Sequence, residues 1–150
     1  MGVETMGRVL VRVKVENLAD LYLAARGHLD PGKVRSIEIE DALVDTGATA
    51  LCLPRRIVSQ LGLAPGQKRS VRTAGGLIDV AFYDAVKLTV QGRNCTIDVA
   101  AIDDNCPVLI GQVPLELLDF VVDPKGQKLI GNPAHGGEQM FELYTYLRKP

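Results

Sequence analysis

Residues 42–49 read Ala42-Leu43-Val44-Asp45-Thr46-Gly47-Ala48-Thr49, and the Asp-Thr-Gly triplet within them occurs once in the 150-residue chain. Aspartate and glycine are common turn residues, so the plain interpretation is the end of a strand. The apolar lead-in, however, indicates that the carboxylate of Asp45 emerges from the core. Gly47 lets the backbone approach closely, and the two threonines supply hydroxyls that can hold it. The pattern therefore predicts a fixed, partly desolvated carboxylate that a ligand can reach.

The composition indicates a single soluble domain with a substantial core, since 47% of the residues are hydrophobic and 23% are charged. The net charge of −1 gives no reason to expect a polyanionic partner. With no Trp and three Phe, the chain has little material for base stacking, which argues against nucleic acid binding. No apolar run approaches the ~18 residues of a membrane span.

The three cysteines, Cys52, Cys95 and Cys106, are scattered and odd in number. Reduced, buried thiols in a cytoplasmic protein are the expectation for such a set. No paired Cys or His spacing predicts a metal site, and we expect no cofactor. The N-terminal residues contain an early Glu4 and no apolar core of sufficient length, so they do not resemble a signal peptide.

Apolar periodicity along the chain predicts mostly short strands. Residues 17–27 fit either a short helix or an irregular strand. Strands are expected at 8–16, 34–44, 51–54, 86–90, 95–102 and 107–111, hairpins at 70–83 and 120–130, helices at 55–61 and 114–118, turns at 28–33 and 65–66, and an edge strand in the tail at 141–147. This distribution favours a mainly β domain, barrel-like or sandwich-like, with one or two short helices.

A second apolar run, Val108-Leu109-Ile110-Gly111, is weak alone and gains meaning from its position. The chain resembles the retropepsin-like aspartic proteases, a family of retroviral and bacterial one-domain enzymes. In that family an Asp-Thr-Gly turn is followed by a flap hairpin, an apolar strand ending in Gly, and a short helix. The resemblance covers about residues 34–130 in this order. It implies a closed β-barrel acid-protease fold in one domain, 1–150, with an N-terminal extension of about 1–33 and a C-terminal tail of about 131–150.

The resemblance also assigns roles to residues. Asp45 is the expected catalytic residue. The expected active-site turn and dimer grip is Thr46, Gly47, Ala48 and Thr49; the expected flap is Thr73, Ala74, Gly75 and Gly76; the expected supporting strand is Leu109, Ile110 and Gly111. Two departures stand out. Gln112 and Val113 follow the glycine where many viral members carry a basic residue and Asn or Asp, and the flap tip has no bulky apolar side chain.

Aspartic proteolysis needs two carboxylates that share one proton around one water molecule. One Asp-Thr-Gly triplet per chain therefore predicts a homodimer in which Asp45 faces Asp45 of a second copy. The expected activity is endopeptidase cleavage of peptides or unfolded protein segments. The aromatic tail residues Phe141, Tyr144 and Tyr146 are candidates for packing between the subunits.

Other functions are compatible with parts of the sequence. One alternative is a retropepsin-like module that binds peptides or partners and cleaves weakly or not at all. Another is aspartyl-phosphate chemistry, but Thr46 and Gly47 stand where such enzymes carry a lysine or a second acid. No nucleophile elbow of the G-x-S-x-G type is present, and His28 and His135 are expected on the surface. Cys52 lies between two leucines in an expected buried strand, which argues against a cysteine protease.

Overall fold

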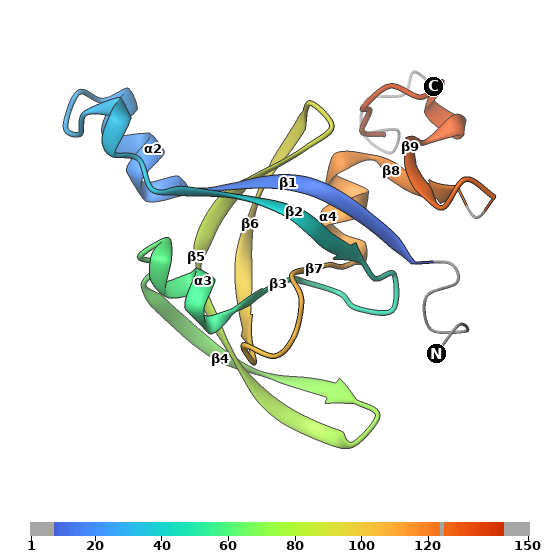
Figure 1. The fold of residues 1–150 in the computed structure, drawn as a ribbon, viewed down its shortest axis with the longest axis horizontal. Coiled ribbons are helices and arrows are strands. Elements are labelled where there is room, and N and C mark those ends of the chain that lie inside the picture. The colour runs from blue at the N-terminus through green and yellow to red at the C-terminus, as the bar shows by residue number, and fades with distance from the viewer. Residues whose placement is uncertain (1–7, 124, 143–150) are drawn as a thin grey trace, which may run out of the picture.

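The structure of the protein is a computed structural model that describes residues 8–123 and 125–142. The strands are β1 (Val9–Asn17), β2 (Ser36–Val44), β3 (Leu51–Pro54), β4 (Pro65–Thr73), β5 (Gly76–Val90), β6 (Arg93–Ile102), β7 (Leu109–Ile110), β8 (Phe120–Asp123) and β9 (Lys128–Gly131). The helices are α2 (Leu18–Ala25), α3 (Arg55–Gln60) and α4 (Gln112–Leu118), with 3-10 turns at Pro31–Lys33 and Pro133–His135. The mainly β prediction with short helices is confirmed (Figure 1). No helix in the described ranges is long and apolar enough to cross a membrane.

Seven strands form one sheet in the order β1-β2-β7-β3-β6-β5-β4, and a second pairing between β1 and β5 closes it into a ring. The alternation predicted for residues 8–16 explains why β1 can close the ring. Its four alternate valines, from Val9 to Val15, are all buried, and Val13 pairs with Ile39 on one side and with Val90 on the other. This strand comes from the segment that the resemblance assigned to an N-terminal extension.

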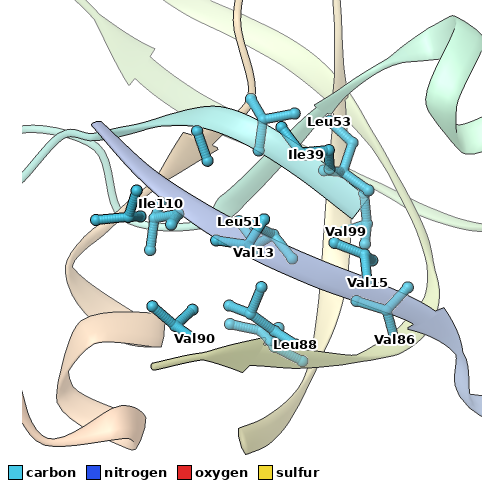
Figure 2. Close-up of a cluster of buried hydrophobic side chains, with 14 of the residues drawn as sticks. Val13, Val15, Ile39, Leu51, Leu53, Val86, Leu88, Val90, Val99 and Ile110 are labelled. Carbon is cyan, nitrogen blue, oxygen red and sulfur yellow. The ribbon is translucent and has the colours of Figure 1, made fainter. Parts of the chain in front are cut away.

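The core fills the inside of this ring (Figure 2). Side chains from β1, β3, β5 and β7 converge there, including the fully buried Val15, Leu51, Leu88 and Ile110. Burying one such side chain contributes about 1.5–3 kcal/mol to folding. The inward face of every strand in the ring is therefore committed to packing, and the ligand-accessible chemistry lies on the loops and the outer face.

The structure corrects two details of the expected strand pattern. Residues 76–90 form one long strand, β5, in place of two separate strands, and a register shift between Tyr83 and Val86 lets it bend from the hairpin into the ring. The turn expected at residues 65–66 is instead the start of β4, where Pro65 pairs with Tyr83. Proline is tolerated there because β4 is the last strand of the sheet and Pro65 its first residue.

The sequence allowed either a short helix or an irregular strand at 17–27, and the structure has the helix α2 there. This helix lies far from the turn between β2 and β3 (Figure 1). Asn17 caps the helix, since its side chain accepts a hydrogen bond from the backbone N–H of Asp20. Asp20 is buried and receives two hydrogen bonds from the guanidinium of Arg35, at 2.8 and 3.0 Å. These bonds hold the pKa of Asp20 below its usual value. The ion pair thereby fixes the segment that connects β1 to β2.

The structure contradicts the surface position expected for His135. Helix α4 ends at Asp119 in the left-handed conformation, and the buried carboxylate of Asp119 lies against the segment that follows β9. Nδ1 of His135 lies 2.6 Å from that carboxylate and Nε2 lies 3.2 Å from Glu142, leaving the imidazole 14% exposed. Arg93 donates to the carbonyls of Leu118 and Asp119 beside it. Periodicity could not reveal this burial because the contacts join distant segments.

The hydrogen bond between His135 and Asp119 raises the pKa of the imidazole and lowers the pKa of the carboxyl group. A raised His135 pKa stabilises the fold below about pH 6.5, and this contribution is lost as the pH rises through the folded-state pKa. A lowered Asp119 pKa stabilises it above about pH 3.9, and this contribution is lost on acidification. We therefore expect His135→Gln to lower the melting temperature most at about pH 5. Thermal unfolding measured across pH checks this.

His28→Gln serves as the control, because His28 is the other histidine of the chain and is exposed. The melting temperature of His28→Gln should differ only slightly from that of the wild-type protein at every pH. A constant difference for His135→Gln from acid to alkaline pH would contradict the proposed protonation.

The tail strand expected at 141–147 lies mostly outside the described residues; Phe141 is exposed and not in a strand.

Candidate active site

The turn after β2 is fixed by backbone hydrogen bonds at both ends. The N–H of Asp45 donates to the carbonyl of Ile110 at 3.0 Å, and the carbonyl of Asp45 accepts from the N–H of Ala48 at 3.0 Å. The N–H of Gly47 donates to Oδ1 of Asp45 at 3.0 Å. One carboxylate oxygen is thus oriented by its own turn, while the side chain remains partly exposed. This is the fixed but reachable carboxylate that the sequence predicts.

The expected supporting strand, β7, lies between the two strands that flank the turn. It runs parallel to β2, with Val44 opposite Ile110, and antiparallel to β3, with Leu51 opposite the same residue. Ile110 is completely buried, and Leu109 on the outer face is half-buried. The end of β7 therefore reaches the Asp45 turn from behind.

Helix α4 begins where β7 meets the turn. The N–H groups of Gly111, Gln112 and Val113 donate to the carbonyls of Ala50, Ala48 and Thr49, at 3.0, 2.8 and 3.0 Å. The first N–H groups of a helix lack partners within the helix, and here the turn supplies them. The turn and the helix start therefore satisfy each other's backbone groups.

Gly111 is required by this close approach. A Cβ atom at residue 111 would lie 2.5 Å from the carbonyl oxygen of Ala50 and 2.8 Å from that of Ala48. Both contacts are with backbone, which cannot swing aside as a flexible side chain can.

The hairpin of β4 and β5 projects from the ring (Figure 1). Its tip is the expected flap segment, with Ala74 and Gly75 in the turn and Gly76 at a φ of +116°, which favours glycine. The hydroxyl of Thr73 donates to the carbonyl of Gly76 and accepts from the N–H of Gly75. All four tip residues are exposed. The tip is thus narrow and internally bonded.

A mainly apolar cleft of about 830 Å³ separates the Asp45 turn from this hairpin. It brings together the turn and the hairpin, two of the segments singled out in the sequence. Its walls include Gly47, Ala48, Thr49, Ala50 and Cys52 on one side, Val71, Thr73, Ile78 and Val80 on the hairpin, and Ala100, Ile102 and Val113 from β6 and α4. Ala74, Gly75 and Gly76 lie at the exposed tip and outside this lining.

Sequence reasoning did not identify Arg69, Phe82 and Asp98 as part of the cleft wall. The strand alternation of β5, in which Ile78, Val80 and Phe82 share a face, was the available signal. Cys52 lines the cleft. The structure contradicts the expected burial of the thiols, because Cys52 and Cys95 are half-buried and Cys106 is exposed. Burial, with the nearby Asp45 and Cys106, raises the pKa of the Cys52 thiol to about 11. It is therefore protonated at neutral pH and a poor nucleophile.

Comparison with known proteins agrees with this geometry. A family model described as aspartyl protease matches residues 31–124, more than half of the chain. The chain therefore belongs to the aspartyl protease family, within the retropepsin-like clan. No curated protein matches the chain.

Proposed function

We propose that the chain is an aspartic endopeptidase that acts as a homodimer, with Asp45 of each copy forming one half of the catalytic pair. The observation that carries this proposal is the single Asp-Thr-Gly turn, fixed from behind by β7 and α4 and opening beside an apolar cleft. Family membership supports a protease-type function.

In the proposed mechanism, two Asp45 carboxyl groups approach across a twofold axis and share one proton, because two like charges so close cannot both ionise. The ionised carboxylate takes a proton from a water molecule as that water attacks the peptide carbonyl carbon. The protonated carboxyl donates its proton to the carbonyl oxygen. The tetrahedral intermediate then collapses as the carboxyl that took the proton from water donates it to the leaving amine nitrogen. The other carboxylate takes back a hydroxyl proton from the intermediate, which leaves a carboxylic acid product and restores the shared proton.

The remaining roles follow from the positions of the residues. Thr46 is exposed beside Asp45, where it can contact the second copy, and the Gly47–Thr49 backbone borders the cleft. The hairpin carries β4, an edge strand whose free N–H and C=O groups can pair with an extended peptide. Its tip, Thr73–Gly76, closes over that peptide as the flap. The three free thiols fit a cytoplasmic location.

A peptide library digested at acidic to neutral pH and analysed by mass spectrometry tests the proposal. We expect internal cleavage, with a rate that rises and then falls with pH because the pair must hold a single proton. Turnover per chain should also fall on dilution, in parallel with the dimer fraction measured by sedimentation. No cleavage at any pH by a folded, dimeric sample would overturn the endopeptidase proposal. Turnover per chain that is independent of concentration across dimer dissociation would overturn the shared pair.

A further inference from the structure

The mainly apolar cleft wall carries an ion pair, formed by Arg69 of β4 and Asp98 of β6. The register explains how they meet. Arg69 pairs with Val80, so both point to the cleft face of the hairpin, and the guanidinium of Arg69 lies 4.5 Å from the centre of the Phe82 ring. The guanidinium extends over that ring, and its Nη1 lies 3.4 Å from Oδ2 of Asp98.

This ion pair lies at the end of an outward-facing row that starts next to the catalytic turn. Leu43, two residues before Asp45, is opposite Leu109, which is opposite Cys52, and the row continues to Ala100 and Phe82. Four strand spacings separate Leu43 from Phe82, or about 19 Å along the curved sheet. An extended peptide covers that length with about five or six residues, and fewer along the chord. Arg69 is therefore within reach of an outer residue of a bound substrate.

Arg69 retains unused hydrogen-bonding capacity. A guanidinium has five N–H donors, and the structure gives Arg69 one contact with one carboxylate oxygen. The side chains of Arg69 and Asp98 are 54% and 42% exposed, so both are accessible from the cleft. Stacking on Phe82 orients the guanidinium plane, which favours an acceptor in that plane.

The charged residues of the cleft wall favour an acidic side chain in a bound peptide. Those residues are Arg69, Arg72 and Asp98. The register places Arg69 on the cleft face of β4 and Arg72 on the opposite face, so Arg69 is the cation that a bound side chain meets. A basic substrate residue would compete with Arg69 for Asp98, whereas an acidic one would complete the coordination of Arg69 without displacing Asp98.

We propose that Arg69 is a specificity-determining residue that selects peptides with an Asp or Glu roughly three to six residues from the scissile bond. The inference rests on the proposed function, because it takes the cleft as the peptide site. In a twofold dimer, Arg69 of each copy stands at one end of the joined cleft. The acidic preference therefore occurs on both sides of the scissile bond.

The test uses binding rather than turnover, with Asp45→Asn in the full-length protein so that peptides are held without cleavage. The probes are fluorescein-labelled decapeptides of neutral, mostly apolar sequence, with Glu placed at each position in turn and Gln in the matched set. Fluorescence anisotropy should show Glu binding about two- to five-fold more tightly than Gln at outer positions, as for a partly exposed ion pair. The preference should shrink as ionic strength rises.

Added substitutions separate recognition from a structural role. Arg69→Gln should remove the Glu preference while Gln peptides still bind, Arg69→Lys should retain part of it, and Asp98→Asn should increase it by freeing the guanidinium. The matched control is Arg12→Gln. It removes an arginine of β1 that pairs with Glu38 and Glu40 of β2, and it should leave the Glu preference unchanged.

Each other outcome identifies what is wrong. Peptides that bind without discriminating Glu from Gln, or a preference that survives Arg69→Gln, would overturn the role of Arg69 and leave the proposed function intact. A preference for Lys peptides that Asp98→Asn removes would assign specificity to Asp98 instead. Failure of every peptide to bind the folded dimer would overturn the peptide cleft itself, and the inference with it.

Discussion

Replacing Asp45 with asparagine should reduce peptide hydrolysis by about four orders of magnitude, the upper end of what positioned acid–base groups contribute. Both halves of the proposed pair change at once, because each copy supplies the same residue. An amide can neither take a proton from water nor donate a carboxyl proton. Its oxygen can still accept the hydrogen bond that Oδ1 now receives from Gly47, so the turn should keep its shape. Cleavage of a library-derived peptide, followed by mass spectrometry, measures the loss.

Two controls make this result specific. Thermal unfolding should show that the Asp45→Asn variant remains folded, and sedimentation that it still dimerises. Mixing it in excess with wild-type protein should inactivate the wild-type chains by forming mixed dimers, which a monomeric enzyme would not show. An asparagine variant that cleaves at the wild-type rate would place the chemistry on another group.

Replacing Gly111 with alanine should destabilise the fold by about 1–3 kcal/mol, the usual cost of forcing an extra carbon into a packed site. The new Cβ would lie within 2.8 Å of the carbonyl oxygens of Ala48 and Ala50. Relief requires β7 to retreat from the turn, which would lengthen the hydrogen bonds that Gly111 and Gln112 donate to it. We expect activity to fall as well, because the same bonds fix the loop that carries Asp45. Denaturant unfolding and peptide cleavage report the two effects.

Gly32→Ala provides the matched comparison. Its Cβ would meet only Oδ1 of Asp30, at an ordinary 3.5 Å, and residue 32 lies in the short turn between α2 and β2. Stability and activity close to wild type are expected for it. If Gly111→Ala behaved the same way, the approach of β7 to the turn could not be as close as the structure has it.

Local pattern was sufficient for the features that depend on neighbouring residues. The alternating valines of β1, the Asp45 turn and the hairpin tip at Ala74-Gly75-Gly76 are each recognisable within a short stretch of sequence. Order along the chain, together with the family resemblance, was then enough to bring the turn and the hairpin to one cleft.

Features that depend on pairing between distant segments were missed. The resemblance implied a closed barrel, but the residues did not predict the β1–β5 pairing that closes the ring. Nor did they predict the bend that makes 76–90 one strand, because both features require knowing which strands meet. His135 was expected on the surface since nothing near it in sequence reveals Asp119 as its partner. Arg69 and Asp98 likewise look like ordinary solvated charges until the register places them over one cleft.

The insertion of β7 between β2 and β3 also sets the order in which the molecule can be assembled. Leu43 and Leu51 are synthesised early, but the strand that separates β2 from β3 arrives only with Leu109 and Ile110. Until then the loop between them lacks the backbone partners that Ile110 and the start of α4 supply, and non-local pairings of this kind form slowly. A nascent chain therefore carries Asp45 while every residue up to Ile110 is still being made, and only then can β7 hold it in place. The fixed conformation of the Asp45 turn is thus acquired only after β7 and the start of α4 have been made.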